Sequence, residues 1–380
     1  MILIVKSEAP AEDDQVLTLS VTKEDRQVLE QAGAAHLRAL LADRGGLVSR
    51  SRILADDNYD IPLGASDEDI EIMETMRECA LAWVGGDGAF EPYGRGVELG
   101  GDGFVIRCSS CFEWQVGPRR RAQRRGGGYE SKTCEFCGAE MADGEWEASA
   151  RMIVNDRPEA GSAQDRRLPG SGWAPLYLGD DISRHYLDDP KWIRLGVPNI
   201  AYKEDALYAA PKLLVRQAGV GVNVAVDETE ARCLQSAYVY RVREGVEIDP
   251  YYLLACLASR AMLFFFHRST NQTEWQSFPK LVHSTLQRLP LPDPARAGRE
   301  LHDQIADLGR RRMGLLAADA HDLDLEIENL VMEAYGLSPE QRQRIMRTLR
   351  SVQRLRVIRE MFPDEGAEPP LSLGVDGVAP

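Results

Sequence analysis

The sequence predicts an α+β chain, with a mostly-β middle part flanked by helical regions at both ends and an inserted four-cysteine zinc ribbon. Three observations predict this class. Apolar residues recur at helical spacing near both ends of the chain. Short apolar runs separated by turns fill the middle. Two Cys-x-x-Cys pairs, which have the spacing of a structural metal site, stand at the start of the middle part.

The composition narrows the class of protein further. The chain has 380 residues, of which 44% are hydrophobic, enough for one large core or two to three modest ones. Its formal net charge of −15 argues against a protein that coats nucleic acid through bulk charge, although a local basic surface remains compatible with it. No apolar run is long enough to span a membrane, and the opening "MILIVK" is too short for a signal-peptide core. We therefore expect a cytoplasmic protein.

Residues 1–85 are expected to form a helical region, a candidate for docking a partner. A first helix should begin at Thr22, with Asp25 completing a capping box, and should end in the glycines near residue 46. A second should begin at Ser66, with Asp69 three residues on, and should continue to the glycine-rich 85–88.

The middle part divides into a β segment with the zinc ribbon (86–150) and a mostly-β region (151–294). Glycines at 219–222 stand between two β-like runs, so they predict a hairpin turn and not a cofactor loop. A single helix is expected in "DPYYLLACLASRAMLFFFHR", capped by Asp249 with Pro250 at its first position.

Residues 295–362 are expected to be helical, and residues 363–380 a disordered tail rich in proline and glycine. Ser338 and Gln341 predict a capping box at the start of the last helix, with Pro339 at its first position. That helix is rich in arginine, and it is equally compatible with a DNA contact and with a solvated surface.

The strongest chemical signal is the pair of cysteine knuckles. Cys108 and Cys111, with Cys134 and Cys137, have the spacing of a four-cysteine structural zinc site. Gly138 follows the second pair, where a left-handed turn residue is expected. Four thiolates would close the tetrahedron and leave no position for a catalytic water, so the single Zn²⁺ that we expect is structural.

The loop between the knuckles is dense in basic residues, which suit phosphate oxygens and the guanine edge in the major groove. A solvated loop that answers acidic patches elsewhere in the chain is an equally good interpretation. The basic residues are Arg119, Arg120, Arg121, Arg124, Arg125 and Lys132.

Three stretches follow in an order typical of one family. "LYLGDDISRHYLDDPKWIRLG" precedes "APKLLVRQAGVGVNVAVDE", and then comes "DPYYLLACLASRAMLFFFHRSTNQTEWQSFPKLVHSTLQRLPLPDP". In this order they resemble the TaqI-like target-recognition (specificity) domain of adenine-specific DNA methyltransferases and restriction–modification enzymes. The resemblance extends over most of the chain from residue 89 to residue 347, and it places the target-recognition domain at 151–294.

The resemblance implies duplex DNA as the ligand. The matching strand residues Lys212 and Arg216, with Lys280, would contact the DNA backbone. In the polar loop 268–277, Asn271, Gln272 and Gln276 carry amides that are able to pair with adenine, although an ordinary polar loop would look the same.

The sequence departs from those enzymes in its catalytic motifs. We find no Asn/Asp-Pro-Pro-Tyr/Phe tetrapeptide, no glycine-rich loop for S-adenosylmethionine and no nuclease cluster. We therefore expect a non-enzymatic specificity subunit of a restriction–modification or phage-defence system. Its partners would be a separate adenine-specific DNA methyltransferase and, as a further candidate, a nuclease or helicase of the same system.

Two other hypotheses remain open. The main rival is a zinc-stabilised scaffold that binds a protein or RNA partner through the basic loop. A partial methyltransferase-like enzyme is the poorer alternative, since the catalytic tetrapeptide is missing.

Overall fold

The fold is α+β, as predicted, and the chain divides into two compact units. The computed structural model describes residues 14–19, 21, 23–55, 64–83, 88–91, 94–99, 104–119, 127–146, 148–150, 154–155, 172–219, 221–269 and 280–350. Unit 1 comprises residues 1–89, 218–223 and 245–380, and unit 2 comprises residues 90–217 and 224–244. This division differs from the consecutive segments expected from the sequence, because the helices near residue 260 group with those at the C-terminal end.

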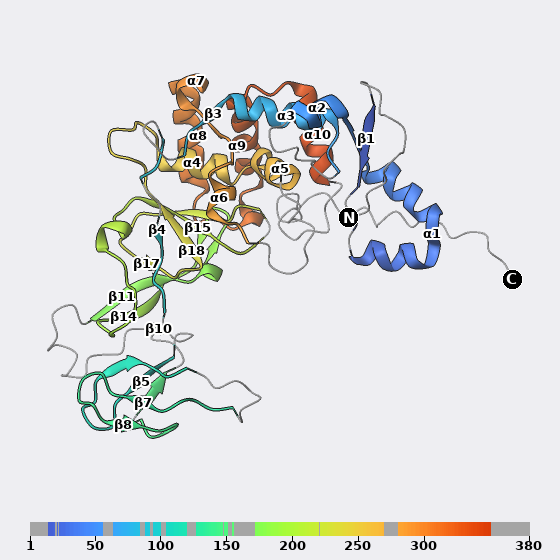
Figure 1. Cartoon of the computed structure of the whole chain (residues 1–380). Helices are drawn as coiled ribbons and strands as arrows, with labels where there is room; N and C mark the ends of the chain where they lie inside the picture. The colour runs from blue at the N-terminus through green and yellow to red at the C-terminus, as the bar shows by residue number, and fades with distance from the viewer. Residues whose placement is uncertain are drawn as a thin grey trace. The chain divides into compact units, whose positions relative to one another are not determined.

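Unit 2 contains two four-stranded sheets (Figure 1). The first has the order β16 (Val224–Asp227), β15 (Lys212–Arg216), β18 (Ala237–Tyr240) and β4 (Gly94–Arg95), and it is antiparallel throughout. The second has the order β10 (Val154–Asn155), β14 (Lys191–Leu195), β11 (Gly172–Tyr177) and β17 (Arg232–Cys233), with the last pair parallel. Along the chain, η3 (Gly179–Asp181) and the hairpin of β12 (Ile182–Ser183) and β13 (Tyr186–Leu187) follow β11, and η4 (Asp205–Tyr208) precedes β15.

The strands of the β15–β16 hairpin are almost completely buried in unit 2. They pair Lys212 with Asp227 and Val215 with Val224. All four residues of β16, and the first four of β15, are buried, so both faces of these strands are covered. Gly219 and Gly221 in the connection have φ of 141° and 73°, values that favour glycine. The predicted hairpin is thus confirmed.

The cysteine module, residues 104–119 and 127–150, is also part of unit 2. It is built from β5 (Val105–Arg107), which pairs with β6 (Trp114–Val116) and β9 (Ala148–Ala150), and from the pair β7 (Lys132–Thr133) and β8 (Glu140–Met141). Val105 belongs to the core cluster that contains Leu176, Ile193 and Leu214 of the two larger sheets. The module is therefore packed onto the β core by its first strand.

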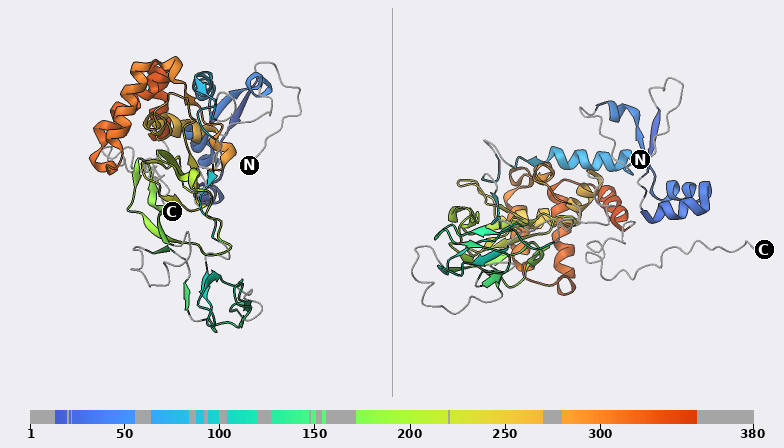
Figure 2. Two further views of the ribbon diagram at one scale, coloured as in Figure 1. Left: turned by 90° about the vertical axis from the view of Figure 1, so that its left-hand side faces the viewer. Right: turned by 60° about the horizontal axis from the view of Figure 1, so that its bottom comes forward.

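Unit 1 is mostly helical. Its N-terminal part contains β1 (Gln15–Thr18) paired with β2 (Gly46–Ser49), α1 (Lys23–Arg44), α2 (Arg50–Ala55) and α3 (Asp67–Glu78). Its later part contains α4 (Pro250–Leu257), α5 (Arg260–Ser269), α6 (His283–Leu286), α7 (Pro294–Ala297), α8 (Arg299–Arg312), η5 (Ala317–Asp319), α9 (His321–Ala334) and α10 (Pro339–Arg350). Helix α8 packs along α4 and α9 (Figure 1). Figure 2 shows these helices, coloured from yellow to orange, from two further directions. In the described part of the chain, no helix combines the length and the apolar character needed to cross a membrane.

The predicted helix starts are confirmed at three positions. Asp249 caps α4 through the N–H of Tyr251, at 2.8 Å. Ser66 and Asp69 form the expected capping box of α3. Ser338 and Gln341 exchange the same pair of contacts at the start of α10. The proposed cap of α1, Thr22, lies outside the described residues.

Three helix predictions need correction. Helix α3 ends at Glu78, because residues 80–81 form β3 (Ala80–Leu81), which pairs with β19 (Leu291–Pro292). The helix expected after Asp249 is two helices. Between them, the Ser259 hydroxyl donates to the Cys256 carbonyl at 2.8 Å and accepts the Met262 N–H at 3.0 Å, so it ends α4 and begins α5. Helix α1 is interrupted at Gly33, where φ is 58°.

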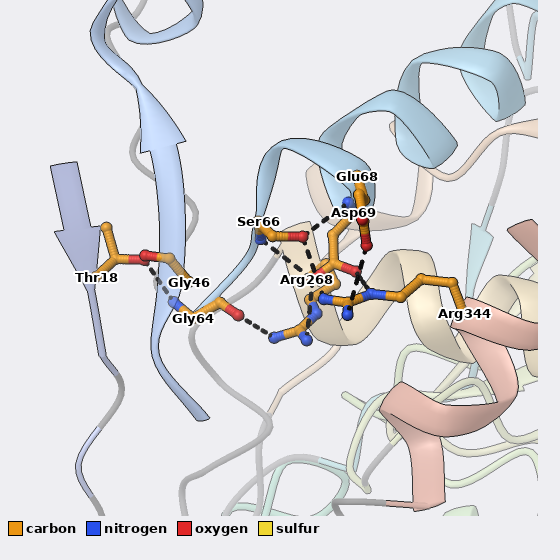
Figure 3. Close-up of polar contacts among 8 residues, drawn as sticks. All are labelled: Thr18, Gly46, Gly64, Ser66, Glu68, Asp69, Arg268 and Arg344. Carbon is orange, nitrogen blue, oxygen red and sulfur yellow. Dashed lines mark hydrogen bonds and ion pairs between the residues drawn. The ribbon is translucent and has the colours of Figure 1, made fainter. Parts of the chain in front are cut away.

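A buried carboxylate joins three helices of unit 1 (Figure 3). Asp69, in the first turn of α3, is fully buried. Its oxygens accept from Arg344 of α10 at 2.7 Å and lie 3.0 Å from the guanidinium of Arg268 of α5. Arg268 also donates to the Gly64 carbonyl at 2.6 Å, and the Gly64 N–H donates to Thr18 at 3.0 Å. This network of hydrogen bonds and ion pairs, with Asp69 at its centre, links β1, α3, α5 and α10.

Replacing Asp69 by asparagine is expected to lower the free energy of unfolding of unit 1 by about 1.5–3 kcal/mol, the range for hydrogen bonds to a charged group. Asparagine keeps the capping oxygen but removes the charge that faces two arginines. Ser66→Ala is the matched control, since it removes the cap and the hydrogen bond from Arg344 at 3.1 Å but leaves the buried charge, and it should cost about 1 kcal/mol. Urea unfolding followed by far-UV circular dichroism measures both. Equal losses in the two variants would contradict a role for the charge.

Candidate metal centre and nucleic-acid interface

The four cysteines converge on one point in the cysteine module. The sulfur atoms of Cys108, Cys111, Cys134 and Cys137 all lie within 4.8 Å of one another. Cys108 Sγ is 3.7 Å from Cys137 Sγ, and Cys111 Sγ is 3.6 Å from Cys134 Sγ. Four sulfurs at Zn–S distances of 2.3 Å in a tetrahedron would stand about 3.8 Å apart. The cluster therefore fits a tetrahedral metal ion.

The two knuckles have the same backbone pattern. In the first, Phe112 N–H donates to the Cys108 carbonyl at 3.0 Å, and in the second Gly138 N–H donates to the Cys134 carbonyl at 3.0 Å. Phe112 and Gly138 have φ of 63° and 73°, so both knuckles turn through a left-handed residue. The expectation for Gly138 is confirmed. Phe112 does the same at the first knuckle without being glycine, which the sequence does not reveal.

Backbone N–H groups point at the sulfurs and favour thiolates. Ser110 N–H donates to Cys108 Sγ at 3.3 Å, and Phe136 N–H donates to Cys134 Sγ at 3.4 Å. Burial raises the pKa of Cys134, but the N–H groups of Cys137 and Phe136 outweigh it and lower the pKa to about 6. Burial and the neighbouring thiols raise the pKa of Cys111 to about 12. Four thiolates so close together repel one another, and a cation is what would hold all four ionised.

A small aromatic cluster closes the base of the arginine-rich loop. Phe104 stacks on Tyr129 with ring centroids 4.4 Å apart, and Trp146 meets Phe104 edge-on at 5.8 Å. Tyr129 N–H donates to Asp143 at 2.9 Å, and Glu130 N–H donates to the Arg119 carbonyl at 3.2 Å. Both ends of the loop are thereby fixed to the cysteine module.

Two of the six basic residues of the loop that are predicted to contact DNA, Arg119 and Lys132, are among the residues that the structure describes. Arg119 is exposed at the start of the loop, as a DNA contact requires. Lys132 forms an ion pair with Glu135 at 2.5 Å, so a carboxylate already neutralises its charge. Arg120, Arg121, Arg124 and Arg125 lie outside the described residues.

The position of Lys212 contradicts its predicted role as a contact to the DNA backbone. Its side chain is completely buried, and its ammonium group donates to Asp227 at 2.6 Å and to the Thr229 carbonyl at 2.6 Å. Burial lowers the pKa of Lys212, although the neighbouring Asp227 opposes this. A DNA phosphate has no access to this ammonium group in the folded chain, so Lys212 holds β15 to β16 and does not belong to a DNA-contacting surface.

Arg216 lies at the end of β15, and a polar cluster begins at the residue after it. Arg216 pairs with Asp180 at 2.5 Å, and Asp180 is itself exposed. The next residue, Gln217, donates to the Gln235 carbonyl at 2.6 Å. Arg95, from edge strand β4, reaches the same carbonyl at 3.3 Å and the Gln217 side chain at 3.5 Å. Sequence reasoning missed Arg95 and Gln235, because only the sheet order β15–β18–β4 brings them to Gln217 at the end of β15.

Lys280 is exposed and forms an isolated bridge with Ala218, next to the β15–β16 connection. Because the residue is exposed, solvent reaches its side chain. The predicted base-reading amides Asn271, Gln272 and Gln276 lie outside the described residues.

Comparison with protein families identifies the middle of the chain. Residues 174–291 match the TaqI-like C-terminal specificity domain. The match begins in β11, covers the β15–β16 hairpin with α4 and α5, and ends at β19. The resemblance predicted from the ordered motifs is thereby shown, and this region is similar to a TaqI-like specificity domain. No curated protein matches the sequence.

Solved structures with partial similarity belong to restriction–modification systems. The type IIL enzyme MmeI in complex with DNA has 7% identity and a TM-score of 0.27, and the match covers 46% of this chain and 31% of that chain. A type I system has 13% identity, a TM-score of 0.23 and coverages of 82% and 59%. The HsdS subunit from Thermoanaerobacter tengcongensis has 12% identity, a TM-score of 0.22 and coverages of 82% and 58%. The chain spans less than two thirds of the length of each.

Proposed function

We propose that this chain, with its TaqI-like specificity domain, binds duplex DNA at a target sequence and presents it to a separate adenine-specific DNA methyltransferase. The observation that carries the proposal is the match of residues 174–291 to a specificity domain. The chain itself would be non-enzymatic, and the methyl transfer, with any nuclease or helicase activity, would reside in the partners.

Arg216 and the polar cluster next to it, Arg95, Gln217 and Gln235, support DNA contact within this domain. Two guanidinium groups at the end of one sheet suit neighbouring phosphates. The side-chain amide of Gln217, beside Arg95, has the donor and acceptor pattern that pairs with adenine. Asp180 would have to release Arg216, and because Asp180 is exposed the ion pair costs little to break.

The cysteine module would add a second contact. We propose that one structural Zn²⁺, held by the four cysteines, fixes the arginine-rich loop at its base so that Arg119 and the arginines after it face DNA. Arg119 is exposed, and the loop starts and ends on hydrogen-bonded residues of the module. These features hold the two ends of the loop on the module and support a basic surface there.

Removing Arg95 and Arg216 is expected to weaken DNA binding and its salt dependence. For Arg95→Ala/Arg216→Ala, the slope of log K against log salt should decrease in magnitude by roughly 1.8, since each phosphate contact contributes roughly 0.9. Fluorescence anisotropy with mixed-sequence duplex DNA over a salt series measures it, for the chain alone and with its methyltransferase. A variant of Arg119, Arg120, Arg121, Arg124 and Arg125 to alanine tests the loop in the same way.

Arg241→Ala is the matched control. Arg241 is in the same unit, but it is held by Glu91 at 3.1 Å and by the Ala206 carbonyl at 2.9 Å. Its loss should leave the salt slope unchanged. If the control changes the slope as much as the double variant, the effect is general charge and the polar cluster is not the contact. If neither the chain nor the complex binds duplex DNA at low salt, the proposed function is wrong.

A zinc-stabilised interaction protein remains the second candidate. Phe112 and Phe136, one on each knuckle, are 45% and 48% exposed, and paired exposed aromatic rings are typical of protein-binding surfaces. Under this hypothesis Phe112→Ala/Phe136→Ala would abolish binding of a protein partner and leave DNA affinity intact, whereas the arginine variants would do the reverse under the proposed function.

A further inference from the structure

A pocket of about 370 Å³ opens between α9 and α10 of unit 1. This volume lies within the range of functional ligand sites. Its lining includes apolar and cationic side chains, from Leu325 and Met332 of α9 and from Arg342, Met346, Arg347 and Arg350 of α10. The one carboxylate in the lining, Glu328 of α9, is buried and accepts the Arg260 N–H at 2.7 and 2.8 Å.

Helical spacing brings these side chains to the pocket. On α9, Leu325 and Met332 are seven residues apart and share one face, and on α10, Arg342, Met346 and Arg350 recur every four residues. The opposite face of α10 buries Ile345 and Leu349 completely. Leu325 is 37% exposed, so an apolar side chain remains in solvent at the edge of the pocket.

The arginines of α10 divide into two sets. Arg344 faces inward and pairs with Asp69 and Glu68. Arg342 lines the pocket and donates through Nε to the Leu337 carbonyl at 2.9 Å, which fixes the base of its guanidinium group. Among the residues that the structure describes, neither Arg342 nor Arg347 forms an ion pair with a carboxylate. In a chain of net charge −15, two such cations beside one pocket are unusual.

We propose that the α9–α10 pocket binds an acidic amphipathic helix of a partner protein. Its apolar side chains would pack on Met332, Met346 and Leu325, because the flexible thioether groups adapt to a variety of apolar side chains. Its carboxylates would pair with Arg342 and Arg347. Arg342 and Arg350 are eight residues apart, which corresponds to about 12 Å along the axis of α10. This length matches roughly two turns of a bound helix.

The apolar side chains favour a protein over nucleic acid as the occupant. A phosphate backbone would use the arginines but would leave the two methionines and the leucine without a partner. The inference is independent of the proposed DNA recognition, since it concerns unit 1 and a different class of ligand.

The test uses the full chain and three fluorescein-labelled 14-residue helical peptides. The first has leucines at three positions spaced i, i+4, i+7 with glutamates around them, the second replaces the glutamates by lysines, and the third replaces the leucines by serines. The acidic amphipathic peptide is expected to bind with saturable anisotropy and at least tenfold more tightly than either of the others. Arg342→Glu/Arg347→Glu should weaken it at least tenfold.

Arg311→Glu on α8 is the control, since Arg311 is 58% exposed and does not line the pocket. It should leave peptide affinity unchanged, and Met346→Glu should weaken it without altering α10's inward-facing arginine. The proposal is overturned if the first peptide does not saturate up to millimolar concentration, if the lysine peptide binds as tightly, or if the control weakens binding equally. It is also overturned if the double variant loses affinity for duplex DNA but not for the peptide, because the surface would then contact nucleic acid.

Discussion

Replacing Lys212 by alanine is expected to lower the free energy of unfolding by about 3–5 kcal/mol, the usual cost of removing one partner of a buried ion pair. The reason is the carboxylate that remains. Asp227 is 2% exposed and would keep two hydrogen bonds, from the N–H of Thr229 at 2.9 Å and from its hydroxyl at 2.7 Å, but no cation. The Asp227 carboxylate would then be a buried negative charge without a cation at the contact between β15 and β16. Urea unfolding with intrinsic fluorescence as the signal measures the loss.

The double variant Lys212→Met/Asp227→Asn distinguishes the pair from simple loss of packing. Methionine restores most of the apolar volume, and asparagine keeps an oxygen for Thr229 without the charge. We expect it to recover more than half of the stability lost in Lys212→Ala. A DNA-contacting lysine would behave differently: Lys212→Ala would unfold at the same urea concentration as the unchanged chain and would bind DNA less tightly. That result would restore the interpretation of Lys212 as a DNA-contacting residue, which its burial contradicts.

Local features could be read from the sequence because neighbouring residues create them. The knuckle geometry follows from two cysteines three positions apart, and Gly138 adopts the left-handed turn that this spacing needs. The caps at Asp249 and Ser338 depend on hydrogen bonds that cross only two or three residues. Ser259 shows the limit of such reasoning, because a polar residue inside a long apolar run can equally face a neighbouring helix or divide the run into two helices.

Lys212 and Arg95 could not be placed from the sequence, for different reasons. A lysine at the start of a strand is normally expected at the surface, but both faces of β15 are covered, and only the register with β16 shows that Asp227 is opposite. Arg95 is far from Arg216 along the chain, and no periodic pattern connects β4 with β15. Burial and sheet order are non-local properties, so the candidate DNA contacts changed while the candidate metal ligands did not.

Removal of metal from the four-cysteine cluster is expected to unfold the cysteine module while the β15–β16 hairpin stays folded. Among the described residues, the module's own core cluster contains Phe104, Ile106 and Met141 as buried apolar side chains, besides Cys108 and Cys134. Three such residues supply too little burial to offset the chain entropy of the module. Binding of a structural Zn²⁺ contributes about 10–16 kcal/mol in comparable small sites. The metal would therefore supply most of the folding free energy.

Native-state hydrogen exchange with and without a chelator measures this. Amides of 104–119 and 127–146 should lose protection on chelation, and those of Lys212–Arg216 should keep it. Cys134→Ser should behave as the chelated protein and hold no zinc by elemental analysis, whereas Cys79→Ser, outside the cluster, should retain one zinc per chain. Equal protection with and without chelator would mean that the aromatic stack of Phe104, Tyr129 and Trp146 is sufficient to hold the module.

The same experiment connects the metal to the arginine-rich loop. The loop is closed at its base by the Glu130 N–H on the Arg119 carbonyl and by Tyr129 on Asp143, contacts that belong to the module. When the module unfolds, the arginines of the loop keep their charge, but the two ends of the loop are no longer held together. DNA affinity should then fall without the decrease in salt slope that the arginine-to-alanine variants give, because the number of cations is unchanged and only the closure of the loop is lost. A slope that decreases on chelation would show instead that the loop leaves the DNA altogether.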